Sequence, residues 1–434
     1  MQHPLRVGVA GLGTVGLAVL ELLDRQAATV AARCGRKIAV TAVAAKEAGK
    51  ERGRDLTRFT WFDDPAKLAA SPDIDLFVEL IGGADGAALA CVEAALAAGK
   101  SVVTANKALI AKHGLQLAEL SEQKGVALGF EASVAGGIPI VKTLREDLAG
   151  NAISRVYGIL NGTCNDILSR METEHLPFGE CLAQAQRLGY AEADPSFDIG
   201  GLDTAHKLAI LTALAFGTRI DPEAIAVEGI QDISLADIDA AAELGFRIKL
   251  LGVAARTGAG IEQRVHPTMV PRSSAIAQVM GVANAVTIDA DAVHELTLIG
   301  PGAGGEATAS AVIADIVNIA KGLRTPPFGV PVAALAPLQR TPIQMHEGGY
   351  YIRLSVYDRP GAAAAIAARM AERSISLESI VQRRRPDEHG KPAAVPVILM
   401  THATYEKLIR EALAAVIGDG FIAEPPQLIR IERG

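Results

Sequence analysis

The sequence predicts an α/β protein with three domains: a doubly wound parallel sheet, an α+β unit and a small β-α-β-β-α-β module. A glycine-rich turn joins a strand to a helix near the N-terminus, which is how a doubly wound sheet begins. The pattern changes near residue 150, and five prolines between residues 326 and 342 mark a second boundary. We expect domains at 1–140, completed by about 305–340, at 141–304 and at 349–434.

Length and composition exclude several classes of protein. The chain has 434 residues, half of them hydrophobic, which suits two or three folded domains. A net charge of −7 argues against a nucleic-acid partner, and no apolar run reaches the roughly 18 residues that span a bilayer. The N-terminus reads directly as a strand, so we expect a cytoplasmic protein without a signal peptide. The four cysteines show no C-x-x-C spacing, so neither a zinc site nor a disulfide framework is predicted.

The N-terminal glycines match a dinucleotide-binding fingerprint. They form a G-x-G-x-x-G motif between an apolar strand (5–10) and a helix, the context that this motif requires. The first glycine permits a tight turn, the second lets the backbone approach a pyrophosphate, and the third allows helix and strand to pack closely. The alternative is a glycine turn without a ligand. We predict a Rossmann-type domain whose phosphate contacts come from Gly11, Gly13, Thr14, Val15 and Gly16.

The end of the second strand bears on the choice of cofactor. An acidic residue there would bind the ribose hydroxyls of NAD, but strand 38–44 is followed by Ala45, Lys46 and Glu47. Lys46, with Arg52 and Arg54 behind it, favours the 2′-phosphate of NADP, whereas Glu47 leaves NAD open. A solvated basic loop explains these cations equally well.

Three further positions are expected at the cofactor crevice. Ligands of doubly wound sheets bind at the carboxyl ends of the strands, and the buried stretch 100–107 ends with Thr104 and Lys107 close together. For Lys107 taken alone, an exposed lysine at the start of a surface helix is the simpler explanation. A glycine turn at 300–306 opens a helix of small residues and places Gly304 at a second wall of the crevice.

Residues 189–211 carry the most informative chemistry. A polar loop containing Glu192, Asp194 and Asp198 opens a helix on which Asp203 and Lys207 lie four residues apart, and hence on one face. After Lys207 the helix is apolar nearly all round, which indicates burial. Burial disfavours a charged ammonium and a neighbouring carboxylate favours it, and that balance suits a proton donor and acceptor. A structural ion pair at a helix start is the alternative.

A second polar turn follows the strand predicted at 154–160. It consists of Asn161, Gly162 and Thr163 and precedes a helix. These groups could hold a small polar substrate, although capping of the helix is the simpler explanation.

The C-terminal region has a regular pattern typical of a separable ferredoxin-like module. Strands and helices are expected at 350–357, 362–374, 377–385, 394–402, 404–417 and 427–432. With the turn Asp358-Arg359-Pro360-Gly361, this order looks like an ACT domain, which commonly binds amino acids between paired copies. A purely structural dimerisation module is the alternative.

Taken together, these motifs resemble bacterial homoserine dehydrogenase across essentially the whole chain. The resemblance implies the reversible, nicotinamide-dependent interconversion of L-homoserine and L-aspartate 4-semialdehyde, a step towards threonine and methionine. A dehydrogenase acting on another semialdehyde and a non-catalytic amino-acid sensor are the competing hypotheses. The matching segments are the Gly11–Gly16 fingerprint, Thr104–Leu109, Glu131–Pro139, Asn161–Thr163, Gly189–Lys207, Gly302–Ser310 and the ACT-like tail.

The resemblance also assigns roles to individual residues. Lys207 matches the proton donor to the aldehyde oxygen, and Lys107 the second lysine beside substrate and nicotinamide. Asp203 would orient Lys207 or tune its charge. Glu192 and Asp198 match carboxylates suited to the amino group of homoserine, and substrate contacts are also expected from Asn161, Gly162 and Thr163.

Three further expectations follow from the resemblance. A sodium ion is expected on backbone oxygens of Glu131, Val134, Gly136 and Ile138. Feedback regulation by threonine is expected through the ACT-like tail. The protein is expected to form a homo-oligomer, either a dimer or a tetramer.

Overall fold

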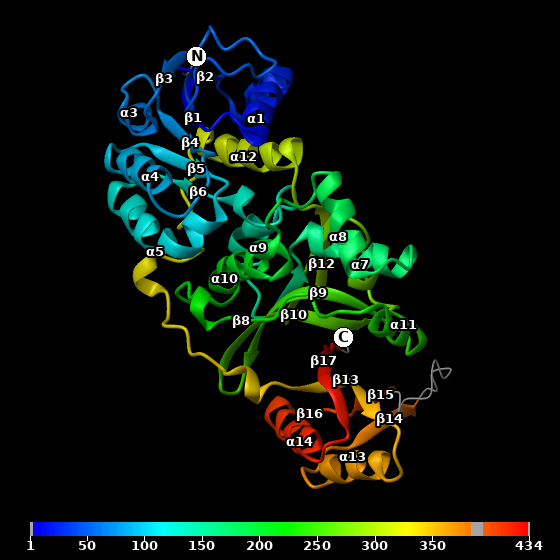
Figure 1. The fold of residues 1–434 in the computed structure, drawn as a ribbon. Helices are drawn as coiled ribbons and strands as arrows, with labels where there is room; N and C mark the ends of the chain where they lie inside the picture. Colours follow the sequence, from blue (N-terminus) through cyan, green and yellow to red (C-terminus); the bar gives the residue numbers. More distant parts are fainter. Residues whose placement is uncertain (1–2, 383–393, 433–434) are drawn as a thin grey trace.

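The computed structural model describes residues 3–382 and 394–432 and forms an elongated molecule (Figure 1). A sheet with flanking helices lies at the N-terminal end, and a smaller α/β unit containing the C-terminus lies at the other end. A second sheet with its helices lies between them. Within the described residues, no helix is long and apolar enough to cross a membrane.

The first sheet comprises β1 (Leu5–Ala10), β2 (Ile38–Ala44), β3 (Thr60–Phe62), β4 (Leu76–Glu79), β5 (Ser101–Thr104) and β6 (Leu128–Gly129). All its pairings are parallel, in the order β3-β2-β1-β4-β5-β6. The order reverses between β1 and β4, and a doubly wound sheet binds its ligand at such a switch point. The predicted Rossmann-type fold is confirmed. Its helices are α1 (Thr14–Arg25), α2 (Ala27–Cys34), α3 (Pro65–Ala70), α4 (Ala87–Ala97) and α5 (Lys107–Lys124).

A helix from much later in the chain, α12 (Gly305–Ala320), packs against α1 (Figure 1). The approach is close, since a Cβ added to Gly305 would lie 3.1 Å from the methyl group of Thr14. An ion pair of 2.9 Å between Arg25 and Glu306 adds to the contact. The apolar side chains of α12 share a core with those of β1 and α1. The first sheet is therefore covered by the N-terminal helices and by a helix that follows the middle domain in the sequence.

The middle of the chain contributes strands β7 (Ile153–Ile159), β8 (Ala226–Val227), β9 (Phe246–Thr257), β10 (Gly260–Pro271), β11 (Ala283–Ala290) and β12 (His294–Pro301). Its helices are α6 (Ile140–Lys142), α7 (Gly162–Thr173), α8 (Phe178–Arg187), α9 (Ser196–Ile199), α10 (Leu202–Phe216) and α11 (Leu235–Glu243). Helix α10 packs against β7, β9, β10 and α5 and is buried along most of its length. The prediction of a buried helix after Lys207 is confirmed.

The C-terminal unit has the predicted β-α-β-β-α-β order, with a short additional strand. Its elements are β13 (Glu347–Tyr357), α13 (Ala362–Ala371), β14 (Leu377–Gln382), β15 (Ala394–Thr401), β16 (Thr404–Tyr405), α14 (Glu406–Gly418) and β17 (Ile422–Ile431). Of the strand expected at 377–385, residues 383–385 lie outside the described part of the chain.

The C-terminal unit continues the sheet of the middle domain. Its strand β17 pairs in parallel with β10 through Thr268↔Arg430 and Met269↔Ile431. The strands of the middle and C-terminal units therefore form one sheet of eleven strands. Nine of them follow the order β12-β11-β7-β9-β10-β17-β13-β15-β14, while β8 pairs with β10 and β16 pairs with β13. Local periodicity predicts the strands but carries no information about pairing between strands so far apart.

A buried lysine lies on the middle sheet. Lys249 on β9 is 1% exposed, and its Nζ donates to Asn165 Oδ1 at 2.8 Å and to the Val279 carbonyl at 2.5 Å. Both acceptors are uncharged, so the ammonium has no hydrogen-bonded counter-ion among them. Burial, helped by the nearby positive charge of Arg247, lowers the pKa of Lys249 to about 7.

This lysine makes stability depend on pH. The unfolded chain keeps the Lys249 proton up to a pKa near 10.4, whereas the folded chain loses it near 7. Between these values the unfolded state binds more protons, so the free energy of unfolding rises with pH. Compared with that of Lys249→Met, the free energy of unfolding of the wild type rises by up to about 1.4 kcal/mol per pH unit. Urea unfolding at pH 7, 8 and 9 measures this, with Lys124→Met at the exposed end of α5 as control. A pH-independent difference would contradict it.

Candidate active site

The glycine turn after β1 is built to approach a ligand closely. Gly11 adopts φ 99°, and a Cβ there would lie 2.3 Å from the Leu80 carbonyl oxygen. A Cβ on Gly16 would lie 2.0 Å from the Gly11 carbonyl oxygen. A Cβ on Gly13 would meet no atom within 4 Å, so this position faces open space. Gly13 is also the N-cap of α1 and supplies no side-chain acceptor, which leaves the first backbone N–H groups of the helix available to an anion.

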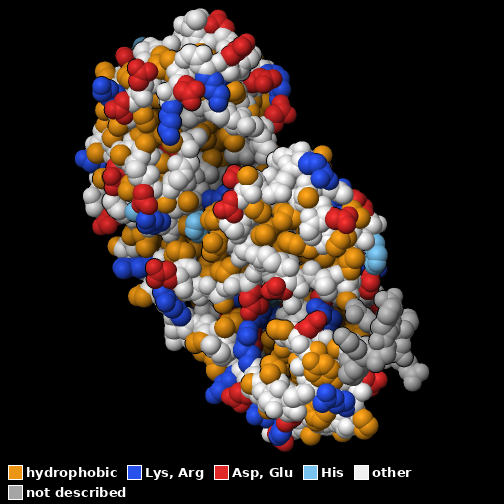
Figure 2. Space-filling view, viewed as in Figure 1, with side chains coloured by type: hydrophobic (Ala, Val, Ile, Leu, Met, Phe, Trp, Pro, Cys, Tyr) orange, Lys and Arg blue, Asp and Glu red, His pale blue; other side chains and the backbone are white. Residues whose placement is uncertain are grey.

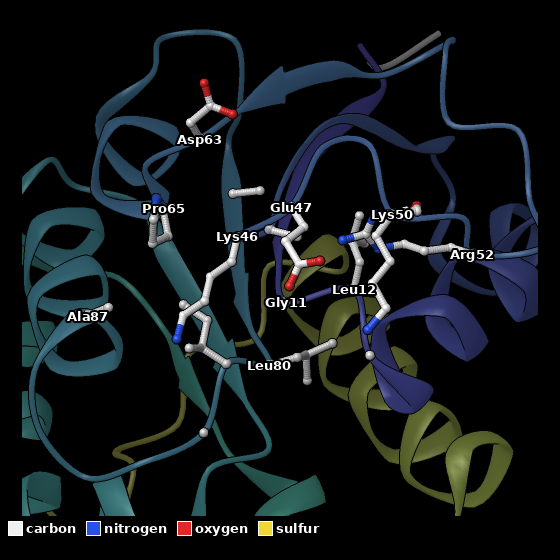
Figure 3. A pocket seen from close by; sticks show the side chains of 15 residues that line it. Gly11, Leu12, Lys46, Glu47, Lys50, Arg52, Asp63, Pro65, Leu80 and Ala87 are labelled. Carbon is white, nitrogen blue, oxygen red and sulfur yellow. Dashed lines mark hydrogen bonds between the residues drawn. The ribbon is translucent and has the colours of Figure 1, made fainter.

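A pocket of about 510 Å³ opens beside this turn (Figure 3). Lys46, Glu47, Lys50 and Arg52 line it from the loop after β2, facing Gly11 and Leu12. Lys50 is a cation that sequence reasoning missed, because only its position on the folded loop brings it to the pocket. The position of these cations suits a phosphate at the far end of a dinucleotide.

The structure places Arg54 elsewhere than the sequence indicated. Its guanidinium forms an ion pair with Asp24 on α1, which Arg58 also contacts, and it does not line this pocket. A guanidinium already paired with a carboxylate is a poor candidate for binding a phosphate.

Thr104 and Asn106 fix the start of α5 and so position Lys107. The buried Thr104 hydroxyl donates to Glu79 at 2.5 Å and accepts from the Asn106 N–H at 2.9 Å. Asn106 then caps α5 by accepting from the Leu109 N–H at 3.1 Å. Lys107 is consequently the first helical residue, at the carboxyl edge of the sheet. Gly304, with φ 112°, is the N-cap of α12, and the next residue, Gly305, approaches Thr14 at the start of α1.

Asp203 binds both lysine ammonium groups. Its Oδ1 lies 2.9 Å from Lys107 Nζ, and its Oδ2 accepts from Lys207 Nζ at 2.8 Å. The Asp203 side chain is 4% exposed. Burial alone would raise its pKa, but the charges and hydrogen bonds of Lys207 and Lys107 hold the pKa of Asp203 well below its usual value. Two lysines 100 positions apart in sequence are thereby brought to one carboxylate.

Lys207 lies deeper than Lys107. Its Nζ also donates to the Leu160 carbonyl at 2.6 Å, and its side chain is 11% exposed against 36% for Lys107. An ammonium has three N–H donors, so two bonds leave one for a substrate oxygen. The Leu160 carbonyl was not identified from the sequence, because a backbone acceptor carries no residue-type signal.

Asn161 joins the second carboxylate to this cluster. Its Nδ2 donates to Asp198 at 2.9 Å and to Asp203 at 2.8 Å, while its Oδ1 accepts from the Cys164 N–H and caps α7. Asn161 therefore caps α7, the simpler of the two explanations that the sequence offered, and its amide also binds both carboxylates. Burial and the neighbouring charge of Asp203 raise the pKa of Asp198.

Other residues predicted at the substrate site lie at its margin. Glu192 is exposed on the loop before α9, and the Thr163 hydroxyl donates to the Tyr190 carbonyl at 2.7 Å. Gly162 allows a close approach, since a Cβ there would lie 2.7 Å from the Val282 carbonyl oxygen. His206, one residue before Lys207, was not singled out. Its ring packs edge-on against Phe197, and burial lowers its pKa.

The segment expected to bind sodium gives that expectation no support. The Glu131 carbonyl accepts from the Val134 N–H, and the Ile138 carbonyl accepts from the Ile140 N–H. The Glu131 carboxylate accepts from the N–H groups of Val141 and Lys142 at 2.9 Å. In the described residues no group of three or more His, Cys, Asp or Glu could hold a metal ion.

Comparison with known proteins agrees with this architecture. The family model described as homoserine dehydrogenase matches residues 139–317, that of its NAD-binding domain matches residues 11–131, and that of the ACT domain matches residues 350–417. The homoserine dehydrogenase of Pseudomonas aeruginosa is 44% identical over the full length of both chains. That of Neisseria gonorrhoeae is 43% identical over 99% of each chain.

Solved structures give the same result. The crystal structure of a homoserine dehydrogenase from Thiobacillus denitrificans has a TM-score of 0.93 and 43% identity, covering 100% of this chain and 99% of that one. A hyperthermophilic archaeal homoserine dehydrogenase, solved in complex with NADPH, has a TM-score of 0.64 and 27% identity over 74% of this chain and 98% of its own.

Fold, site and comparisons together define an NAD(P)-dependent oxidoreductase with a C-terminal ACT domain. More particularly, the chain belongs to the homoserine dehydrogenase family.

Two glycines of the fingerprint are expected to respond differently to alanine. Gly13→Ala adds a methyl group to the open pocket, so the thermal midpoint stays unchanged while the dissociation constant for the reduced nicotinamide cofactor rises at least about tenfold. Gly16→Ala forces a methyl group into the Gly11 carbonyl, so the thermal midpoint falls. Thermal unfolding and fluorescence titration with NADPH measure both effects. Equal behaviour of the two variants would contradict this assignment.

Proposed function

We propose that this chain interconverts L-homoserine and L-aspartate 4-semialdehyde with NADP, and that Lys207 exchanges the proton with the reacting oxygen. The observation that carries the proposal is the pair of ammonium groups on the buried carboxylate of Asp203. A bound nicotinamide supplies or accepts the hydride. The chain's own residues hold the substrate and manage the charge that the transfer creates.

In the direction of reduction, hydride addition to the aldehyde carbon leaves negative charge on the oxygen. The Lys207 ammonium transfers to that oxygen the proton that is bonded to neither Asp203 nor Leu160, and it becomes a neutral amine. In oxidation, neutral Lys207 accepts the hydroxyl proton as hydride leaves the carbon. Asp203 stays ionised throughout, because its pKa lies well below its usual value, and it keeps Lys207 oriented in both directions. Lys107 adds positive charge beside the developing anion.

We assign the amino group of the substrate to Asp198, with Glu192 approaching from the exposed loop before α9. The pKa of Asp198 is raised in this structure, and the ammonium group of an amino acid would restore its ionised form. Asn161 keeps Asp198 beside Asp203. Recognition of the amino group and proton transfer thus take place within one hydrogen-bonded cluster.

The preference for NADP rests on Lys46, Lys50 and Arg52, all of which line the pocket. The NADPH bound to the archaeal relative supports the same choice. Glu47 and Asp63 also line the pocket, and they would oppose a 2′-phosphate. The surplus of one cation favours the phosphate.

Loss of Lys207 is expected to abolish most of the activity. In Lys207→Met, kcat for L-homoserine oxidation falls about 100-fold or more, because the proton acceptor is gone, while the affinity for NADPH is retained. Initial rates of NADPH formation at alkaline pH measure the change. Lys112→Met, which alters an exposed lysine of α5 paired with Asp85, is the control. Near-normal turnover by Lys207→Met would overturn the assignment.

Reversal of one charge in the pocket tests the cofactor preference. Lys46→Glu lowers the ratio of kcat/KM for NADP to that for NAD by about tenfold or more, because a carboxylate would face the 2′-phosphate. Arg54→Gln leaves the ratio unchanged, since Arg54 is paired with Asp24. Steady-state kinetics with both cofactors measure the two variants. If Arg54→Gln lowered this ratio more than Lys46→Glu did, Arg54 would bind the 2′-phosphate, as the sequence indicated.

The ACT domain is assigned to feedback by threonine, acting on a homo-oligomer of two or four chains. The turn Asp358–Gly361 opens α13, with Gly361 at φ 90°. Saturating threonine is expected to lower the rate of homoserine oxidation or to change the assembly state. Rate assays and light scattering with and without threonine measure both. No change in either would exclude threonine as the effector.

A further inference from the structure

The ACT domain holds one carboxylate of the middle domain between two arginines. Arg430 on β17 donates to Glu228 at 2.7 and 3.0 Å, and Arg410 on α14 donates to it at 3.1 Å. Glu406 orders both arginines, accepting from Arg430 at 2.7 and 2.8 Å and from Arg410 at 2.8 Å. Arg430 is 1% exposed and Glu406 is fully buried. Acidic and basic side chains also gather on the surface where the two domains meet (Figure 2).

The backbone beside Glu228 contacts the end of α9. The Glu228 N–H donates to the Val265 carbonyl at 2.8 Å, and the Ile230 N–H donates to the carbonyl of Ile199, the last residue of α9, at 2.9 Å. Gly229 lies between them, and a Cβ there would come within 2.4 Å of the same Ile199 oxygen. The segment 228–230 therefore packs in direct contact with the end of α9.

The turn that follows α9 lies between the two site carboxylates. Asp198 precedes the turn and Asp203 follows it, and both accept from Asn161. Gly201 in the turn has φ 87°, and a Cβ there would lie 3.1 Å from Val227 and 3.6 Å from the Glu228 carbonyl oxygen. Because segment 227–230 contacts this turn, a displacement of the segment would displace the turn. It would also displace α9, which precedes the turn and carries Asp198.

We propose that Glu228 is a positioning residue, which the ACT domain holds through Arg430 and Arg410 and which in turn sets the position of Asp198. The proposal deepens the proposed function and rests on it, because it takes Asp198 as the contact for the substrate amino group. Any change in the ACT domain that moves α14 or β17 changes the hold on Glu228. Such a movement changes the affinity for the amino-acid substrate through Asp198, while Lys207 and Asp203 stay in place for proton transfer.

Two variants weaken this contact without leaving a buried charge unpaired. Glu228→Gln leaves Arg430 paired with Glu406, and Arg410→Gln removes a half-exposed guanidinium from the ACT side. Arg369→Gln is the matched control, because Arg369 binds Asp419 and Glu372 inside the ACT domain.

The experiment combines steady-state kinetics with hydrogen exchange. KM for L-homoserine is expected to rise about threefold to tenfold in Glu228→Gln and in Arg410→Gln, with kcat and KM for NADP changed less than about twofold. The double variant is expected to match Glu228→Gln alone, because both changes break the same link. The backbone amide of Ile230 and those of residues 196–201 exchange faster in both variants. Arg369→Gln leaves all of these values as in the wild type.

Unchanged KM and unchanged exchange in either variant would overturn the proposal. Additive effects in the double variant would also overturn it, because Arg410 would then act by another route. If the wild type failed to oxidise L-homoserine, the proposed function would fall, whereas the exchange at Ile230 would still decide whether Arg410 and Glu228 hold α9. If Glu228→Gln failed to fold, Arg410→Gln alone would decide both readouts.

Discussion

The bond of one buried carboxylate to two ammonium groups is the constraint on which the rest of the site depends. Asp203 comes from the first turn of α10, Lys107 from the start of α5 and Lys207 from one turn further along α10. With Asp203 ionised, the three groups carry one net positive charge, which suits an oxygen that becomes anionic during hydride transfer. Lys107 belongs to the Rossmann-type domain and Lys207 to the middle domain, so the charge cluster forms only where the two domains meet.

The middle domain also links this cluster to the C-terminal unit through a continuous sheet. Strand β17 of the ACT domain extends β10, on which α10 packs. The buried charges at the junction, Arg430 and Glu406, are paired closely, as charges removed from water must be. Two contacts therefore connect the ACT domain with the region of the two carboxylates: the shared sheet, and the contact of Arg430 with Glu228, whose neighbour Ile230 binds the end of α9.

Sequence reasoning succeeded where the signal was local. The glycine fingerprint, the buried helix after Lys207 and the pairing of Asp203 with Lys207 all depend on spacings of a few residues. It did not reach contacts between distant segments: Lys107 with Asp203, the Leu160 carbonyl with Lys207, and β10 with β17. It also misplaced Arg54, because nothing in the local pattern indicates that Asp24 on α1 neutralises it. From the sequence, only the resemblance to a family predicted that Lys107 and Asp198 lie in the same site.

The measurement that tests the central claim most directly is the rate of L-homoserine oxidation by Asp203→Asn. Asp194→Asn, on the exposed loop before α9, is its control. If Asp203 holds both lysines in their working positions, kcat/KM falls about 100-fold or more in Asp203→Asn, while the affinity for NADPH is retained. The thermal midpoint also falls, because the buried Lys207 ammonium loses its paired carboxylate. Wild-type kcat/KM in Asp203→Asn, from folded protein, would show that the two lysines work without their shared carboxylate and would contradict this account.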